Sequence, residues 1–216
     1  MPSFKIISVL GELFLPLLLF YLWDWNLHFI LLFFFIDWIA ALILMLAKEF
    51  KVLKNKESSG TVSNILTSFS TNIILIFLAI FFFEIAISRI YAQIDFWQSI
   101  QEFLWIKEFG IPQIFLLVPL LFIMNLQQYN LLFIKTEHFK ILPLAYLKSE
   151  HFFTNLLLVF QGVIFLSFTY IIKADNVLLI LLILIKLIVD LIILPKIRKR
   201  SIEKLLNSQY GKSRYN

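Results

Sequence analysis

The chain has 216 residues, of which 61% are hydrophobic and only 15% are charged, with no cysteine and a net charge of +5. Because soluble domains are about 45–50% apolar, this composition excludes a soluble protein, and the lack of cysteine excludes disulfides, thiolate metal sites and cysteine nucleophiles. The basic charge indicates attraction to anionic lipid headgroups rather than to nucleic acid.

Six apolar segments are long enough to cross a bilayer, which requires roughly 20 residues per helix. They lie at about 6–23, 28–47, 72–88, 111–126, 152–172 and 177–195. Glu12 and Pro16 interrupt the first segment and no small-x-small cleavage site follows it, so we expect a retained helix rather than a signal peptide. We therefore predict an all-α fold for residues 1–216, a single polytopic bundle of six transmembrane helices.

The 19 Lys and Arg residues are distributed unevenly over the predicted connections. Fifteen of them fall in the first few residues, in segments 48–71 and 127–151 and in the tail from 196 to 216. Three fall in segments 89–110 and 173–176, and one lies within a span. Because basic residues concentrate on the cytoplasmic side, we predict cytoplasmic N and C termini and a multi-pass protein of the bacterial cell (inner) membrane.

The outer connection 88–110 is predicted to hold an amphipathic helix that lies on the membrane surface. Its apolar positions at helical spacing are Ile94, Trp97, Ile100 (or Gln101) and Leu104. Four of the five Trp residues map to this outer interface: Trp23, Trp25, Trp97 and Trp105. Trp is enriched where membrane meets water, so the sequence predicts an outer aromatic belt.

The inner connections carry most of the basic residues. Segment 48–56 is predicted to extend the second helix past the headgroups, and segment 126–151 to form an inner interfacial helix or an extension of the fourth span. The residues expected to contact lipid headgroups are Lys48, Lys51, Lys54, Lys56, Lys196, Arg198, Lys199 and Arg200.

Ionisable residues inside the predicted spans are the first functional candidates, because each costs about 3 kcal/mol at mid-bilayer on insertion scales. They are Glu12, Asp37, Glu84, Lys186 and Asp190. Four acids face one base, so some acids must be protonated, hydrogen-bonded or bound to a cation. Lys186 precedes Asp190 in the weaker orientation for a same-helix pair, so Asp37 or Glu12 is the expected partner of Lys186.

Polar side chains without charge extend this set. Asn125, Asn155 and Gln161 are expected to hydrogen-bond between helices. With the five ionisable residues, Asn125 and Gln161 form the predicted intramembrane polar network, which is also the candidate ion path. The alternative is a purely structural role, in which these groups hold the helices together and fix their rotation.

The histidines and the known catalytic sequence motifs are the remaining places to look for chemistry. His28 is placed at the outer boundary and His138 and His151 beside the inner connection, and all three are expected to be exposed or interfacial. No glycine elbow around a serine, no HExxH and no phosphate-binding glycine loop is present, so we predict no catalytic residue, metal or cofactor. Only Gly11 and Gly162 lie in spans, which favours a static bundle over a rocking transporter.

Three short stretches resemble an uncharacterised prokaryotic family of small polytopic membrane proteins, known as a domain of unknown function. They are Phe33-Phe-Phe-Ile-Asp37-Trp-Ile running on to Lys48, then Pro143 with Tyr146, Lys148 and His151, and finally Lys186-Leu-Ile-Val-Asp190. The family has no established activity, so the resemblance implies a fold and no reaction.

These observations lead to three functional hypotheses. The first is a non-catalytic integral membrane subunit, a scaffold or accessory component of a larger membrane complex, whose partners are other integral membrane proteins and anionic cytoplasmic-side lipids. The alternative is a small proton- or cation-coupled transporter that uses the intramembrane acids. The third is a lipid-acting membrane enzyme with Glu137, His138, Glu150 and His151 near the headgroups.

Overall fold

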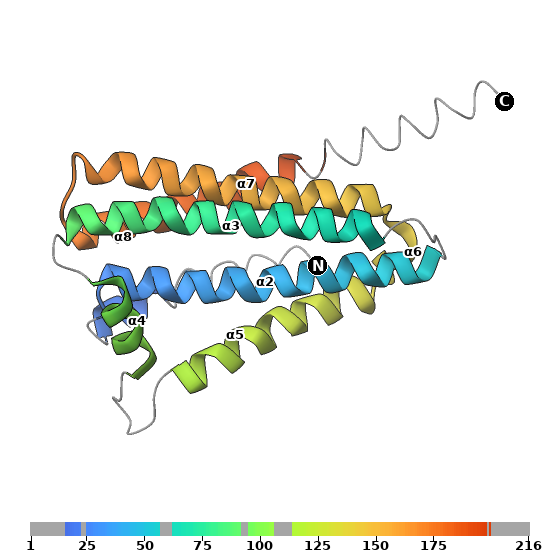
Figure 1. Cartoon of the computed structure of the whole chain (residues 1–216), viewed down its shortest axis with the longest axis horizontal. Coiled ribbons are helices and arrows are strands. Elements are labelled where there is room, and N and C mark those ends of the chain that lie inside the picture. Colours follow the sequence, from blue (N-terminus) through green and yellow to red (C-terminus); the bar gives the residue numbers. More distant parts are fainter. Residues whose placement is uncertain are drawn as a thin grey trace.

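A computed structural model of the chain describes residues 16–22, 25–56, 62–91, 95–105, 114–197 and 199. Of these residues, 91% are helical and none lies in a β-strand. Figure 1 shows the long helices running side by side as a bundle, with α4 at one end and α6 at the other. We refer to these as the α4 end and the α6 end. The prediction of an all-α bundle is confirmed for the described residues.

The described elements are all helices or π-helical turns. After helical residues 16–22 come α2 (Leu27–Lys56), α3 (Val62–Ile90), α4 (Phe96–Trp105), α5 (Ile114–Tyr129), the π-helical turn η1 (Asn130–Ile134), α6 (His138–Ile141), α7 (Leu144–Thr169), α8 (Asp175–Ile188) and the π-helical turn η2 (Val189–Ile193).

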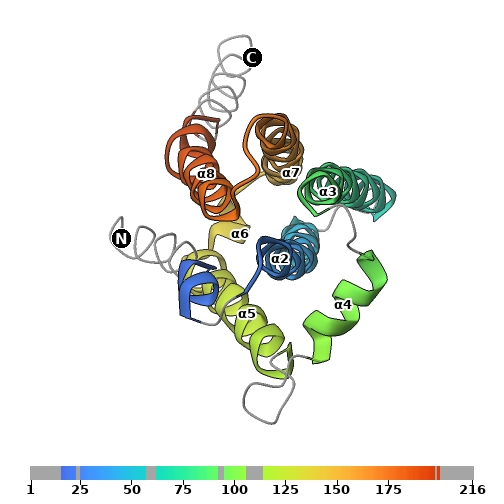
Figure 2. The same cartoon turned by 90° about the vertical axis from the view of Figure 1, so that its left-hand side faces the viewer.

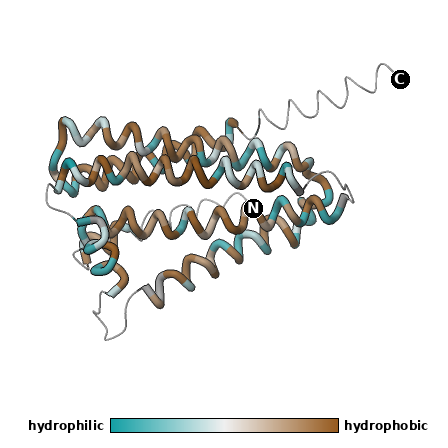
Figure 3. The backbone as a smooth tube through the Cα atoms, viewed as in Figure 1, coloured by the Kyte–Doolittle hydropathy of each residue, from teal (hydrophilic) through white to brown (hydrophobic). Residues whose placement is uncertain are grey.

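Four helices are long and apolar enough to cross a membrane. They are Leu27–Asn55, Ser63–Ile90, Leu144–Thr169 and Asp175–Ile197, and Figure 3 shows apolar residues along most of their length. They correspond to the second, third, fifth and sixth predicted spans and indicate a multi-pass membrane protein. The predicted span 111–126 matches a shorter apolar helix, Val118–Ile134. Most of the predicted span 6–23 lies outside the described residues.

Two of these helices begin earlier than predicted. α3 starts at Val62 rather than at 72, because its Ser/Thr-rich first turns satisfy their side chains within the helix: Thr67 and Thr71 each donate to the carbonyl four residues back. α7 starts at Leu144 rather than at 152. Pro143 precedes it with a φ of −68° and an extended ψ of 144°, a conformation in which proline ends one segment and starts the next.

α2 is the central helix of the bundle. It contacts α3, α4, α5, α6, α7 and α8, and Figure 2 shows these helices arranged around it. Every residue from Leu27 to Phe35 is buried except Phe29, which is partly buried. A helix that is apolar all round is one that its neighbours enclose, and the run of Ile, Leu and Phe in this segment meets that requirement.

The most extensive helix pair is α3 with α7. Gly162 lies at their contact, where an added Cβ would be 3.1 Å from Cβ of Phe82 and 3.2 Å from the carbonyl oxygen of Ala79. These separations are tighter than normal van der Waals contact, so the lack of a side chain at Gly162 sets how closely the two backbones approach. Gly162, one of the two glycines in the predicted spans, therefore serves close packing between helices.

The short elements at the two ends close the bundle. Within the predicted segment 88–110 a helix is observed, the ten-residue α4, and α3 itself continues to Ile90. α4 packs on the bundle through the buried Ser99 and Phe103. In the segment 126–151, the helix of the fourth predicted span continues through η1, and the short helix α6 then packs against α2.

Enlarging Gly162 is expected to separate α3 from α7. Gly162→Val introduces branched atoms where even a Cβ is crowded, and overpacking of this kind costs about 1–3 kcal/mol. The free energy of unfolding in detergent micelles should therefore fall. The matched control is Ser167→Val on the same helix, whose side chain is exposed. An equal effect of the two substitutions would show that the close contact at Gly162 carries no special weight.

Candidate functional site

Three ionisable side chains lie along α2, within the part of the helix that its neighbours cover. His28, Asp37 and Glu49 are nine and twelve residues apart, which places them about 14 Å and 18 Å from one another along the helix axis. They therefore sit at the α4 end, near the middle and toward the α6 end. Each of them meets a partner on a different helix.

At the α4 end, His28 contacts Glu84 of α3. The distance from Nε2 of His28 to Oε1 of Glu84 is 3.3 Å, with the His28 side chain 0% exposed and that of Glu84 21% exposed. The prediction of an exposed His28 is wrong, because the ring is buried and in contact with α3. Glu84, one of the five predicted intramembrane ionisable residues, is thereby engaged in a helix–helix contact.

A second polar contact joins the helices at the same end. The hydroxyl of Tyr91, just after α3, donates a hydrogen bond to the carboxylate of Asp175, the first residue of α8. Burial, and then the adjacent Asp175 carboxylate, raise the pKa of Tyr91 far above its usual value of 10.0. The phenol therefore stays protonated and remains the donor of this bond.

Near the middle of the bundle, Asp37 contacts α5. Nδ2 of Asn125 donates to Oδ1 of Asp37 over 2.8 Å and also to the carbonyl oxygen of Leu121 over 3.1 Å. The predicted interhelical role of Asn125 is confirmed. The Asn125 amide thus donates one hydrogen bond to the Asp37 carboxylate and one to the backbone of α5.

Lys186 and Asp190 approach the same point from α8 and η2. Nζ of Lys186 lies 2.7 Å from Oδ2 of Asp190, and both residues are close enough to Asp37 to act on its charge. Lys186 therefore has a partner on its own helix, while Glu12, one of its two expected partners, lies outside the described residues. The orientation preference of a same-helix pair amounts to about 0.2–0.5 kcal/mol, which is small against the cost of leaving either charge uncompensated in a dry interior. We call Asp37, Asn125, Lys186 and Asp190 the central cluster.

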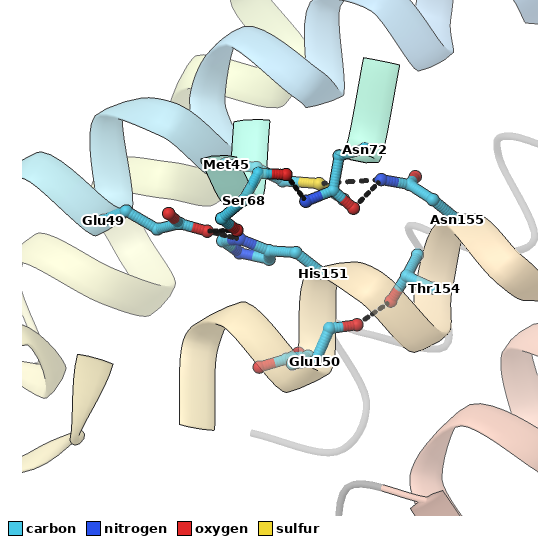
Figure 4. A network of polar contacts seen from close by, with 8 residues as sticks. All are labelled: Met45, Glu49, Ser68, Asn72, Glu150, His151, Thr154 and Asn155. Atoms are coloured by element: carbon cyan, nitrogen blue, oxygen red, sulfur yellow. Dashed lines mark hydrogen bonds and ion pairs between the residues drawn. The ribbon is translucent and has the colours of Figure 1, made fainter. Parts of the chain in front are cut away.

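Toward the α6 end, a buried network surrounds Glu49 (Figure 4). Nδ1 of His151 on α7 lies 2.7 Å from Oε1 of Glu49, and Oγ of Ser68 on α3 donates to the same oxygen over 3.3 Å. The His151 and Glu49 side chains are 4% and 3% exposed. The prediction of an exposed His151 is therefore wrong, because α7 begins about two helical turns before the expected point and carries this ring into the bundle.

Two amides extend the network along α3 and α7. Nδ2 of Asn155 donates to Oδ1 of Asn72 over 2.7 Å, and Nδ2 of Asn72 donates to the carbonyl oxygen of Ser68 over 2.8 Å. Asn155 also lies 3.9 Å from the sulfur of Met45 on α2. The predicted interhelical bond of Asn155 is confirmed. We call Glu49, Ser68, Asn72, His151 and Asn155 the Glu49 network.

The Glu49 network contains a serine, a histidine and a carboxylate, the side chains of a hydrolytic triad. They do not contact one another in the order that a triad requires. In a triad the imidazole contacts the nucleophile on one side and the carboxylate on the other. Here Ser68 and His151 both contact the same carboxylate oxygen of Glu49, so Glu49 stands between them and the imidazole does not activate the hydroxyl. Oε2 of Glu49 is buried without a hydrogen-bond partner among the described residues. The geometry indicates a structural role, in which the Glu49 side chain links α2 to α3 and α7.

The residues proposed for a lipid-acting enzyme are not brought together. His138 is exposed and contacts Thr136 and the carbonyl oxygen of Leu132, Glu137 pairs with Lys140 at 2.7 Å, and His151 belongs to the Glu49 network. In Figure 4, Glu150 accepts a hydrogen bond from Thr154 through its backbone carbonyl, within α7.

No group of three potential metal ligands occurs among the residues that the structure describes. One cavity, of about 380 Å³, lies between α4 and α5, and none of its lining residues is ionisable. They are Leu104, Trp105, Phe115, Val118 and Pro119. This cavity suits an apolar group and offers no polar site.

The other predicted residues have varied positions. Gln161 is buried on α7. Trp25 was expected in an interfacial belt but is buried, in edge contacts with the rings of Phe29 and Phe103, because α4 covers it. Trp97 and Trp105 are 71% and 61% exposed. The predicted residues that lie outside the described part of the chain are Glu12, Trp23, Arg198 and Arg200, with the side chain of Lys56.

Comparison with protein-family models, curated proteins and solved structures gives no match for this chain. The resemblance to an uncharacterised prokaryotic membrane family therefore stays a proposal, and the function must be argued from the geometry of the chain itself.

Removing the carboxylate of Glu49 is expected to destabilise the bundle more than removing an exposed acid. Glu49→Ala leaves the buried His151 and the partly buried Ser68 without their acceptor, and leaving a buried polar group unsatisfied costs about 1–3 kcal/mol. The unfolding free energy in detergent should fall by an amount of this order. Glu102→Ala, at an exposed position of α4, is the control. A Glu49→Ala protein as stable as the Glu102→Ala protein would rule out a structural role for the network.

Proposed function

We propose that this protein is a non-catalytic integral membrane subunit, a scaffold or accessory component of a larger membrane complex. The observation that supports it most directly is that His28, Asp37 and Glu49 of α2 each pair with a side chain of another helix. His28 meets Glu84, Asp37 meets Asn125 and Glu49 meets His151. Groups paired in this way hold helices in register, whereas catalytic groups face a space that a substrate can enter.

The proposed topology is six spans with both termini in the cytoplasm of a bacterial cell, in its inner membrane. The distribution of charge supports this arrangement. Among the described residues, the basic side chains near the α6 end are Lys48, Lys51, Lys54, Lys135, Lys140 and Lys148. Arg89 and Lys173 lie near the α4 end. The α6 end is accordingly assigned to the cytoplasm.

The surface that we assign to a partner protein is α4 with the adjoining cavity. Trp97 and Trp105 are large, apolar and mostly exposed, and the cavity beside Trp105 is lined by apolar side chains of α4 and α5. Exposed aromatic residues next to an apolar depression are typical of protein-binding surfaces. The partner implied is an integral membrane protein that presents an apolar side chain at the same depth in the membrane as this cavity.

The scaffold proposal predicts that the protein is recovered with other membrane proteins after mild crosslinking and gentle detergent extraction. Substituting both Trp97 and Trp105 by Ala should reduce recovery of these partners several-fold, since aromatic hot spots each contribute about 2 kcal/mol or more. The matched control replaces Phe77 and Phe81 of α3, two exposed aromatic residues outside this surface, by Ala. A solitary, monodisperse wild-type monomer would contradict the proposal.

A second candidate function, a small proton- or cation-coupled transporter, is favoured by the central cluster. Asp37 of α2 is under the influence of the Lys186–Asp190 ion pair of the last helix, and Asp190 lies in the π-helical turn η2. π-Helical turns are frequent at functional sites, and ionisable groups inside membranes commonly mark ion pathways.

The transporter hypothesis predicts a pH- or ion-dependent flux across reconstituted vesicles. Asp37→Asn keeps the shape and the contact with Asn125 but removes the titratable group, so flux should fall to the background of empty vesicles. Glu102→Gln, on the exposed face of α4, should leave the flux unchanged. Equal flux in the wild type and in Asp37→Asn would end this hypothesis without affecting the scaffold proposal.

A further inference from the structure

The corner between α2 and α6 is held together by a hydrophobic cluster of its own, separate from the main core. Its buried members are Val52, Phe133, Tyr146 and Leu147, and Phe139 of α6 packs against them. This cluster fixes a helix of only four residues against the last turns of α2. The short helix therefore has a defined position rather than being a loop on the surface.

The backbone that leads into α6 is irregular. Within eight residues the chain passes through the π-helical turn η1 and then through Glu137, whose φ of 53° and ψ of 24° are left-handed. A left-handed conformation is unfavourable for a residue other than glycine, and such positions cluster where function requires them. Here the irregular segment turns α6 so that its side chains meet those of α2.

The side chains that meet at this corner are two lysines and one phenylalanine. Nζ of Lys51, from α2, lies 5.1 Å from the centre of the Phe139 ring, and Nζ of Lys140, from α6, lies 5.9 Å from the same centre. Like charges directed at one ring repel each other. Glu137 pairs with Lys140 but is itself exposed, and Glu49, two residues from Lys51, is occupied by His151. The corner therefore carries a net positive charge.

An exposed apolar side chain also belongs to α6. Ile141, directly after Lys140, is 73% exposed, although Phe139 and Leu142 on either side of this pair pack against the cluster. Two ammonium groups beside an exposed aliphatic side chain match a phospholipid, whose phosphate lies next to its acyl chains. A soluble phosphate would use the lysines but would gain nothing from Ile141.

We propose that Lys51 and Lys140 bind the phosphate of an anionic membrane phospholipid at the corner between α2 and α6. Phe139 holds the two ammonium groups in place through its ring face, and Ile141 lies among the acyl chains of the bound lipid. The site differs from a general attraction of basic residues to the membrane, because it requires two particular lysines from different helices. It does not depend on the identity of any protein partner.

The test is native mass spectrometry of the full chain, released from micelles that contain equal amounts of phosphatidylglycerol and phosphatidylcholine. The wild type should retain phosphatidylglycerol preferentially. The double variant Lys51→Ala with Lys140→Ala should bind it roughly 30-fold more weakly, which corresponds to about 1 kcal/mol for each lysine. Both lysines are exposed, so the variant should melt at the temperature of the wild type.

The matched control is Lys54→Ala with Lys196→Ala, which removes the same charge from exposed positions outside the corner. The control should keep most of the preference for phosphatidylglycerol. An equal loss in both double variants would overturn the proposal in favour of diffuse attraction. Retention of phosphatidylglycerol by the variant lacking Lys51 and Lys140 would overturn it as well.

Two further arms separate a lipid from a free anion. An excess of inorganic phosphate should not displace phosphatidylglycerol from the wild type, and Ile141→Asn should weaken phosphatidylglycerol binding without changing the melting temperature. Complete displacement by inorganic phosphate, or an Ile141→Asn protein that binds phosphatidylglycerol as the wild type does, would show that the corner does not recognise a lipid.

Discussion

The structure depends on the burial of one side of α2 against the helices around it. A polar side chain on that buried side must find a partner within the protein, because neither water nor headgroups can reach it. His28, Asp37 and Glu49 meet this condition through Glu84, Asn125 and His151. The identities of these partner residues on α3, α5 and α7 follow from the burial of α2.

The value of such contacts lies in specificity more than in stability. Apolar packing between α2 and its neighbours could be satisfied by several rotations of a helix rich in Leu, Ile and Phe, and buried polar groups are a known means of selecting one of them. Polar contacts at three depths restrict both the rotation of α2 and its position along the bundle axis. The close approach at Gly162 does the same for α3 and α7.

Composition and the placement of basic residues predicted the all-α fold and the approximate positions of α2, α3, α7 and α8, since both depend on properties of each segment alone. The Glu49 network was missed because Lys48, Lys51 and Lys54 flank Glu49, a pattern typical of an exposed helix end. Its burial depends on α3 and α7 extending beyond their apolar segments, over Ser68 and His151. Similarly, Trp25 is typical of an interface until α4 covers it. These features arise between segments, so a pattern within one segment could not predict them.

The central position of α2 also sets a condition on biosynthesis. Glu49 is made 102 residues before its partner His151, and Asp37 is made 88 residues before Asn125. At about 5–20 residues per second, the ribosome needs roughly 5–20 s to produce the missing helices. During that interval α2 has left the ribosome, but the partners of Asp37 and Glu49 have not yet been made. The insertion machinery therefore has to shield these side chains of α2 from lipid until α7 is made.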